Sequence, residues 1–395
     1  MNDLQAWPPS IMPFLIHADE AALTDLAERL RRVRWPDALE NAGWKFGSDL
    51  SFMKSLHEYW RDTYQWRNQE RSLNTFAHFL HGGDDEHVHF IFELGRGPDP
   101  FPLILTHGWP GSFVEMLKII PMLSDPANHG GDPHDAFTVV VPSIPGYGFS
   151  TAPRRQGTNV FAIADRWAQL MSALGIKQFG VQGGDWGSWI STAIALRQPD
   201  RVRGVHLNYV SMGFRPDLGP GTPPLSDEES KYLARAGQWR DLEGAYFAIQ
   251  STKPQSLAYG LTDSPIGLAA WLIEKFHAWS DSGTDLRDAF TMDELITNVM
   301  VYWLTNTAHS SIRLYIEARL TPLHLRPGQR VIPPCGVVRL PRELPMPPRS
   351  WVERAFNLQH WTELDKGGHF AALEVPQLLA EDIRTFFRPL RRADG

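Results

Sequence analysis

Before residue 86 the apolar residues recur at helical spacing. From Asp19, which is suited to an N-cap, leucine and valine side chains repeat every three or four positions until a Trp-Pro pair, which predicts a helix over 19–34. A second helix, rich in tryptophan and tyrosine, is predicted over 48–64. No catalytic cluster stands out here, so packing is the expected role of these aromatic residues.

Between residues 86 and 210 short apolar segments alternate with helical ones. Strands are predicted at 87–94, 102–108, 137–143, 177–183 and 202–209. Helices are predicted between them at 112–123, 160–174 and 187–197. This alternation indicates the α/β class, with a mostly parallel sheet and helices on both faces.

The strand pattern stops near residue 211 and returns near residue 331. A Gly/Pro-rich segment at 214–226 is followed by predicted helices at 226–238, 241–251, 264–281 and 292–319. Strands at 331–340 and 353–364 and a helix at 374–388 follow. We therefore expect an N-terminal helical extension (1–85), an α/β core in two parts (86–210 and 331–395) and a mainly helical lid, or cap, inserted between them (211–330).

Composition narrows the function classes. The 395 residues are 43% hydrophobic, with a net charge of −7 and no basic stripe, which argues against a nucleic-acid binder. A single cysteine, Cys335, excludes an internal disulfide and a cysteine-based zinc site. His87 and His89 have no further ligand at metal-binding spacing, so we predict no metal and no cofactor.

The apolar segments also bear on location. The first 20 residues have no basic segment followed by a long apolar one, and no window reaches the ~20 apolar residues that span a membrane. The sequence thus predicts a soluble, cytoplasmic protein without a stable membrane anchor.

The strongest chemical signal is the segment GGDWGS, residues 183–188. It follows a predicted strand and opens a predicted helix, which is the setting of a nucleophile elbow, with glycines where the backbone leaves no room for a Cβ. The apex is Asp185 instead of the usual serine, and GxSxG occurs nowhere in the chain, which excludes a serine esterase. The alternative is a glycine-rich turn in which the aspartate only caps the helix.

A second signal, HGWP at 107–110, ends an earlier strand. In hydrolases of this architecture the loop at that point supplies one N–H of an oxyanion hole, and the residue after the nucleophile supplies the other. These would be the backbone N–H groups of Trp109 and Trp186. His107 is expected to be structural.

The third signal, GGHF at 367–370, lies between the last strand and the last helix. A catalytic triad of this fold runs in the order nucleophile, acid, histidine, which makes His369 the expected base. Glu343, directly after the strand at 331–340, is the favoured acid. The remaining candidates for the acid are Glu353, Glu363 and Asp365.

Taken together, the motifs resemble a known family. HGWPGS, PSIPGYGFS, QGGDWGS and GGHFAALE, in this order, are similar to the epoxide hydrolases of the α/β-hydrolase fold, in the microsomal-type branch with juvenile hormone, fungal and bacterial members. The resemblance covers nearly the whole chain, including the branch's extra N-terminal domain. The chain departs from it in lacking a hydrophobic N-terminal anchor and in carrying Cys335 and Arg339-Leu340 where aliphatic and aromatic residues are more usual.

The resemblance implies two lid tyrosines that hydrogen-bond the epoxide oxygen. Tyr246 and Tyr315 match them, and the competing candidates are Tyr232, Tyr259 and Tyr302. It also implies the reaction: an apolar epoxide is opened by Asp185, and the resulting ester is hydrolysed by water that His369–Glu343 activates.

Other functions and roles stay open. The alternatives are a haloalkane dehalogenase, which shares the aspartate nucleophile, and a non-catalytic ligand-binding relative. Detoxification and secondary metabolism are both compatible with the sequence. The oligomeric state also stays open, and a homodimer is one of the possible states.

Overall fold

The computed structural model describes residues 8–83, 86–211, 224–325 and 328–391. Most of the predicted Gly/Pro-rich segment at 214–226 lies outside these residues. Within them, no helix combines the length and the apolar character needed to cross a membrane.

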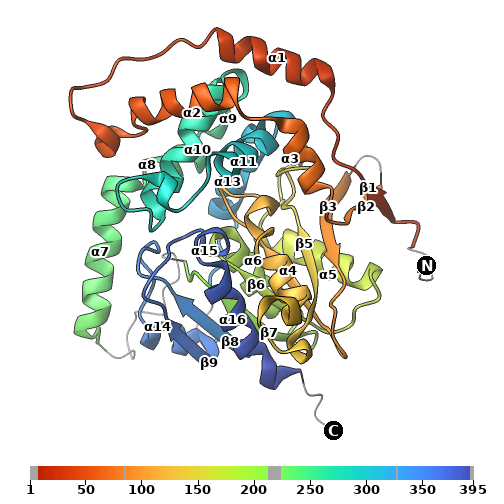
Figure 1. Ribbon diagram of the computed structural model, residues 1–395. Helices are drawn as coiled ribbons and strands as arrows, with labels where there is room; N and C mark the ends of the chain where they lie inside the picture. Colours follow the sequence, from red (N-terminus) through yellow and green to blue (C-terminus); the bar gives the residue numbers. More distant parts are fainter. Residues whose placement is uncertain (1–7, 84–85, 212–223, 326–327, 392–395) are drawn as a thin grey trace.

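The centre of the molecule is one twisted sheet (Figure 1). Over the described ranges its strands follow the order β1-β2-β3-β5-β4-β6-β7-β8-β9. Their bounds are β1 Ile11–Phe14, β2 His78–Gly83, β3 Glu86–Glu93, β4 Phe101–Thr106, β5 Phe137–Pro142, β6 Phe179–Gly183, β7 Val202–Leu207, β8 Val331–Arg339 and β9 Phe356–Glu363. The strands from β5 to β9 are parallel, while β1, β2, β3 and β5 pair antiparallel. This is the α/β-hydrolase architecture that the alternating pattern predicted.

Helices cover both faces of the sheet. In the core they are α4 Ile119–Ser124, α5 Val160–Ala173, α6 Asp185–Arg197, α14 Arg349–Ala355, α15 Ala371–Glu374 and α16 Pro376–Phe387. α5 packs beside α6, and α16 packs beside α4. At Gly180, Gly204 and Gly336 an added Cβ would meet the rings of Phe386 or Phe387, so these glycines let α16 approach the strands closely.

The chain before residue 86 contributes strands as well as helices. The helices are α1 (Glu20–Arg31), α2 (Leu50–Asp62) and α3 (Trp66–Leu73). β1 precedes them in the chain and β2 follows them, and the two strands extend the sheet at one edge. The helical pattern did not predict these strands. β1 is only four residues long and contains Pro13, and its partner β2 is far away in the sequence, so neither strand has a local signal.

The lid consists of helices on top of the sheet's carboxyl edge. They are α7 Asp227–Glu243, α8 Ala245–Gln250, α9 Pro254–Asp263, α10 Pro265–Trp279, α11 Met292–Leu304, α12 Ala308–Ser311 and α13 Arg313–Leu320. α9 was not predicted, and the single helix expected over 292–319 is broken near Asn306, whose φ is 52°. At 353–364, expected to be a strand, the first residues belong to α14 instead.

The N-terminal helices lie across the lid. α1 and α2 pass over α10 and α11 (Figure 1). The Tyr59 hydroxyl donates to Asp293 Oδ1 at 2.9 Å, and the Tyr64 and Thr297 hydroxyls are 3.0 Å apart. Tyr59 on α2 and Tyr64, just after α2, therefore hold α11 in place.

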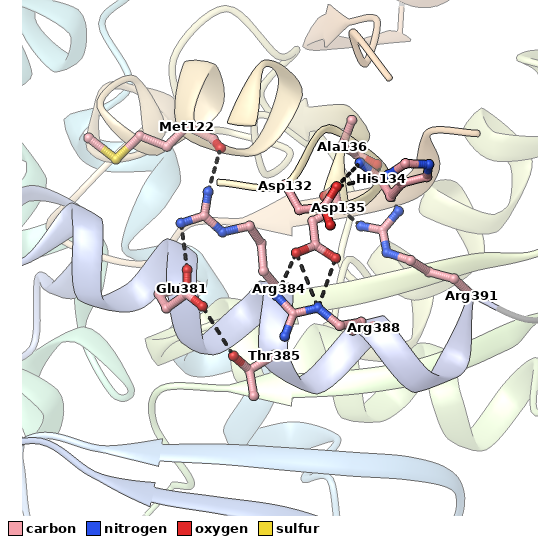
Figure 2. Close-up of polar contacts among 10 residues, drawn as sticks. All are labelled: Met122, Asp132, His134, Asp135, Ala136, Glu381, Arg384, Thr385, Arg388 and Arg391. Atoms are coloured by element: carbon pink, nitrogen blue, oxygen red, sulfur yellow. Dashed lines mark hydrogen bonds and ion pairs between the residues drawn. The ribbon is translucent and has the colours of Figure 1, made fainter. Parts of the chain in front are cut away.

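Arginines fix the C-terminal helix to the core. Figure 2 shows Arg388 against both carboxylate oxygens of Asp135, with a shortest contact of 2.5 Å. Arg391 donates to the backbone oxygens of Asp135 and Ala136 (Figure 2). Arg384 donates to the backbone oxygen of Met122 at 3.4 Å and pairs with Glu381 within α16. These contacts anchor α16, the helix that follows the predicted histidine loop.

Candidate active site

The predicted nucleophile lies on a sharp turn between β6 and α6. Asp185 has a φ of 45°, in the left-handed region that non-glycine residues rarely occupy. A Cβ added to Gly183 would strike the backbone of Gly187, and one added to Gly187 would strike the carbonyl of Thr106. The glycines of this segment are therefore required by close backbone contacts, as the elbow interpretation predicted.

The loop after β4 supplies a donor to this turn. β4 and β6 are parallel neighbours, with Thr106 opposite Gly183, so the residues after each strand meet at the same edge. The backbone N–H of Trp109 donates to Asp185 Oδ1 at 2.8 Å. The Trp186 N–H, the second expected donor, makes no such bond to Asp185 in the described part of the chain, although it follows Asp185 directly.

His369 lies between two carboxylates. Its Nδ1 is 2.6 Å from Glu343 Oε1, and its Nε2 is 3.4 Å from Asp185 Oδ2. Burial alone would lower the pKa of His369, but the negative charges of Glu343 and Asp185 outweigh it and raise this pKa well above its usual value. The structure thus brings together three residues from three separate loops.

The two lid tyrosines face the same place. Tyr246 comes from α8 and Tyr315 from α13, and both line a cavity of about 490 Å³ together with Asp185. Their rings are 5.9 Å apart, and Trp109 stacks on Tyr246 at 5.4 Å. Burial, reinforced by the charge of Asp185, raises the pKa of both hydroxyls well above 10, so each stays protonated at neutral pH.

The rest of the cavity wall is mainly aromatic or apolar. Its large apolar and aromatic side chains are Trp186, Trp189, Tyr209, Trp239, Phe247 and Leu344, and Ser211 and Arg240 add polar groups to the lining. Such a wall favours an apolar ligand, oriented by the few polar groups of the tyrosines and Asp185.

The competing tyrosines lie elsewhere. Tyr302 donates to the carbonyl of Gly111 at 2.6 Å, Tyr232 packs against Trp351, and Tyr259 is 73% exposed. Each has a position that packing or solvation explains.

The competing acids and His107 are also occupied away from the nucleophile. Glu353 pairs with Arg349 on α14, and Glu363 pairs with Arg339. His107 is buried and accepts the Ile144 N–H at 3.2 Å, and burial lowers its pKa to about 4, which keeps it neutral. The geometry therefore favours Glu343 as the partner of His369 and a structural part for His107.

Two further carboxyl groups near His369 were missed by sequence reasoning. Glu374 accepts two backbone N–H groups beside the histidine loop. Burial raises the pKa of Glu115 to about 8, so it is largely neutral at pH 7. Glu374 belongs to the motif GGHFAALE, and Glu115 lies three residues after the motif HGWPGS, but neither position carries a signal of its own.

The chain is similar to known proteins along nearly its whole length. Residues 11–116 match the family described as "Epoxide hydrolase N terminus", and residues 102–380 match the alpha/beta hydrolase fold. A protein of Stigmatella aurantiaca with an epoxide hydrolase name is 44% identical, covering 96% of this chain and 86% of that protein. Epoxide hydrolase 1 of Sus scrofa is 38% identical, over 95% of this chain and 88% of its own.

A solved structure has the same overall fold. The juvenile hormone epoxide hydrolase of the silkworm Bombyx mori superposes with a TM-score of 0.83 at 31% identity, covering 99% of this chain and 97% of that one. The family matches, the sequence relatives and the fold all indicate the same family. The chain belongs to the epoxide hydrolases of the α/β-hydrolase fold, enzymes that act on an ether bond.

Proposed function

We propose that this epoxide hydrolase converts an apolar epoxide to a vicinal diol through a covalent ester on Asp185. The observation that carries the proposal is the position of Asp185: one of its oxygens meets the Trp109 N–H, and the other faces His369, at the floor of a cavity that two protonated tyrosines line. Tyr246, Tyr315, His369 and Glu343 take the roles that the resemblance implied.

In the first step the carboxylate attacks an epoxide carbon. Since Trp109 holds Oδ1, Oδ2 is the attacking oxygen. A bond forms between Oδ2 and the carbon, the carbon–oxygen bond of the ring breaks, and the ring oxygen leaves as an alkoxide that takes a proton from Tyr246 or Tyr315. A tyrosine suits this task because it is still protonated at neutral pH.

In the second step water hydrolyses the ester. His369, oriented by Glu343, takes a proton from water while the water oxygen bonds to the Asp185 carboxyl carbon. The oxyanion that forms is stabilised by the Trp109 N–H and, as proposed from the sequence, by the Trp186 N–H; one such donor is worth about 10²–10³ in rate. Collapse breaks the ester bond, and the leaving oxygen of the diol takes the proton from His369. The Asp185 carboxyl group then gives its remaining proton back to the tyrosine that lost one in the first step, which restores the enzyme.

A single turnover in heavy-oxygen water tests this route. With enzyme in excess, the first diol should contain no label, and the peptide that contains Asp185 should gain it. The control is a second turnover of the same enzyme in ordinary water, which should release labelled diol. Label in the first diol would show direct attack by water and would exclude the ester.

One observation keeps the dehalogenase alternative worth an assay. The indole N–H of Trp186, beside the nucleophile, is buried and has no hydrogen-bond partner within the described residues, so it could receive a halide. Diol formation from styrene oxide and halide release from a chloroalkane should be measured side by side. We expect the first activity to dominate, since a dehalogenase has no use for two tyrosine acids.

The wider biological setting is also part of the proposal. The mainly aromatic cavity wall offers few polar contacts and supports an apolar, aryl-substituted epoxide as substrate. Detoxification, secondary metabolism, a cytoplasmic location and a homodimer stay predictions from the sequence.

A further inference from the structure

The loop that carries His369 is attached to the end of a lid helix. The His369 N–H donates to the carbonyl of Trp279, the last residue of α10, at 2.8 Å. The Gly367 N–H donates to Asp281 Oδ2 at 3.0 Å. At Gly368 an added Cβ would lie 2.6 Å from the Trp279 oxygen. We call residues 279–281 and 367–370 the loop–lid junction.

Glu374 joins the two sides of this junction. It is the last residue of α15, and its two carboxylate oxygens have different partners. Oε1 accepts the N–H of Phe370 at 2.9 Å, and Oε2 accepts the N–H of Asp281 at 2.7 Å. One side chain thus links the residue after His369 to the segment after α10.

The two bonds need a carboxylate. An ionised glutamate offers acceptors on both oxygens, whereas the amide of glutamine has one acceptor oxygen and an NH₂ that would face the second N–H donor. Glutamine has nearly the same size, so it removes one bond without leaving a cavity. Burial raises the pKa of Glu374 to about 7, so the ionised form that accepts both bonds becomes the main one as the pH rises above 7.

We propose that Glu374 is a positioning residue for ester hydrolysis: by bridging the N–H groups of Phe370 and Asp281, it holds His369 in the orientation that activates water. The proposal rests on the covalent route described above. Nothing in that route assigns a part to Glu374, which touches neither Asp185 nor the cavity wall.

The alkylation step should be independent of this bridge. Its nucleophile sits on the β6–α6 turn, and its acids come from α8 and α13. The junction reaches these groups through the Trp279 ring, 5.2 Å from that of Tyr246, and through His369 Nε2, 3.4 Å from Asp185 Oδ2. Glu374 itself bonds only the backbone N–H groups of Phe370 and Asp281, so its loss leaves the nucleophile and the acids on their own elements. A displaced His369 would therefore slow hydrolysis and leave alkylation nearly unchanged. A general structural role would slow both steps together.

The test is Glu374→Gln, with Glu381→Gln as the matched control. Glu381 pairs with Arg384 on α16 (Figure 2), and its side chain is 56% exposed. Rapid-quench single turnovers with styrene oxide give the rate of ester formation, and the decay of the ester gives hydrolysis. In Glu374→Gln we expect hydrolysis to fall by about 10- to 100-fold, because small misplacements of a reacting group cost this much.

Steady-state kinetics give an independent readout. When ester decay limits turnover, kcat and KM of Glu374→Gln should fall together while kcat/KM, which reports alkylation, stays within about twofold of the wild type. Glu381→Gln should match the wild type in every constant.

The outcomes distinguish the positioning role of Glu374 from the covalent route through Asp185. If the wild type forms no ester, the covalent route fails. If it forms the ester and Glu374→Gln hydrolyses it at the wild-type rate, or if both steps slow equally, positioning by Glu374 is wrong and the covalent route stands. Should Glu374→Gln not fold, Asp281→Ala removes the bond to Gly367 from the more exposed side and should slow hydrolysis selectively by a smaller factor.

Discussion

Among the residues that the structure describes, two buried clusters bring histidine and carboxylate side chains together, and they are built in opposite ways. In the catalytic cluster His369 lies between Asp185 and Glu343. In the second cluster, which we call the Asp382 cluster, one carboxylate lies between His206 and His360, at 2.8 Å from each. Both clusters join segments that are distant in the sequence.

Their surroundings differ more than their residues do. The catalytic cluster opens through Asp185 to the cavity, and the flanking carboxylates raise the pKa of His369. The Asp382 cluster ties α16 to β7 and β9, and the hydrogen bonds from its histidines outweigh burial and lower the pKa of Asp382. Histidine and carboxylate together therefore indicate catalysis only where a cavity gives substrate access to them.

The largest expected effect of breaking the catalytic cluster comes from His369→Gln. Without a base the ester should form but persist, so turnover should fall by about 10²–10⁴, the usual contribution of a general base. Mass spectrometry of the peptide containing Asp185 should show the accumulated adduct. Loss of ester formation as well would mean that His369 has a different role.

Glu343→Gln should have the next largest effect. The new amide would donate to His369 Nδ1, favouring the tautomer whose Nε2 carries the proton and cannot act as a base. We expect ester hydrolysis to slow on the order of 10²-fold. Glu353→Gln is the matched control, since Glu353 pairs with Arg349 on an exposed helix; an equal loss there would reassign the acid.

Tyr315→Phe leaves both clusters intact and tests the lid. With Tyr246 still present, alkylation should slow by about 10-fold while ester decay is unchanged, because only the first step needs a proton donor for the ring oxygen. Tyr259→Phe, on an exposed lid position, should have no effect. Pre-steady-state kinetics separate the two steps, and a slower decay would contradict the assignment.

Asp382→Asn should affect stability and leave the chemistry unchanged. Replacing the charged acceptor with an amide weakens two buried hydrogen bonds and should lower the free energy of unfolding by about 2 kcal/mol. Urea denaturation gives this value, and kcat per folded molecule should equal that of the wild type. A selective loss of kcat would show that the two clusters are coupled.

The smallest expected effect is the pH dependence of the difference in unfolding free energy between the wild type and Asp382→Asn. Because the pKa of Asp382 is lowered in the folded state, its stabilisation is present above the unfolded pKa and is lost as the pH falls. The gap in unfolding free energy between wild type and Asp382→Asn should therefore narrow by about 1 kcal/mol between pH 7 and pH 3. A gap that widens at low pH would reverse the assigned direction.

The elbow shows why part of the site could be predicted. Its strand, glycines and helix are consecutive in the sequence, and the same backbone crowding that demands Gly183 and Gly187 is visible as a pattern of small residues. The position of His369 followed from the order of the motifs along the chain. The sequence favoured Glu343 by its place after the strand at 331–340 but left neighbouring acids open, because the choice depends on which side chain faces the imidazole.

The missed features have in common that they depend on distant partners. β1 and β2 pair with each other across most of the N-terminal extension, and neither has a pattern long enough to recognise. Glu374 looks like an ordinary residue of a short helix until the end of α10 is placed against it. Their interactions exist only after the chain has folded.

By itself, then, the sequence determined the α/β architecture with its inserted lid, the aspartate at the elbow and the order of the catalytic motifs, because each is encoded by neighbouring residues. Only the tertiary structure decided which acid meets His369, which tyrosines reach the cavity, and how Glu374 bridges loop and lid. Those contacts join groups on separate loops and helices. The distances between these groups are set by the packing of the whole molecule.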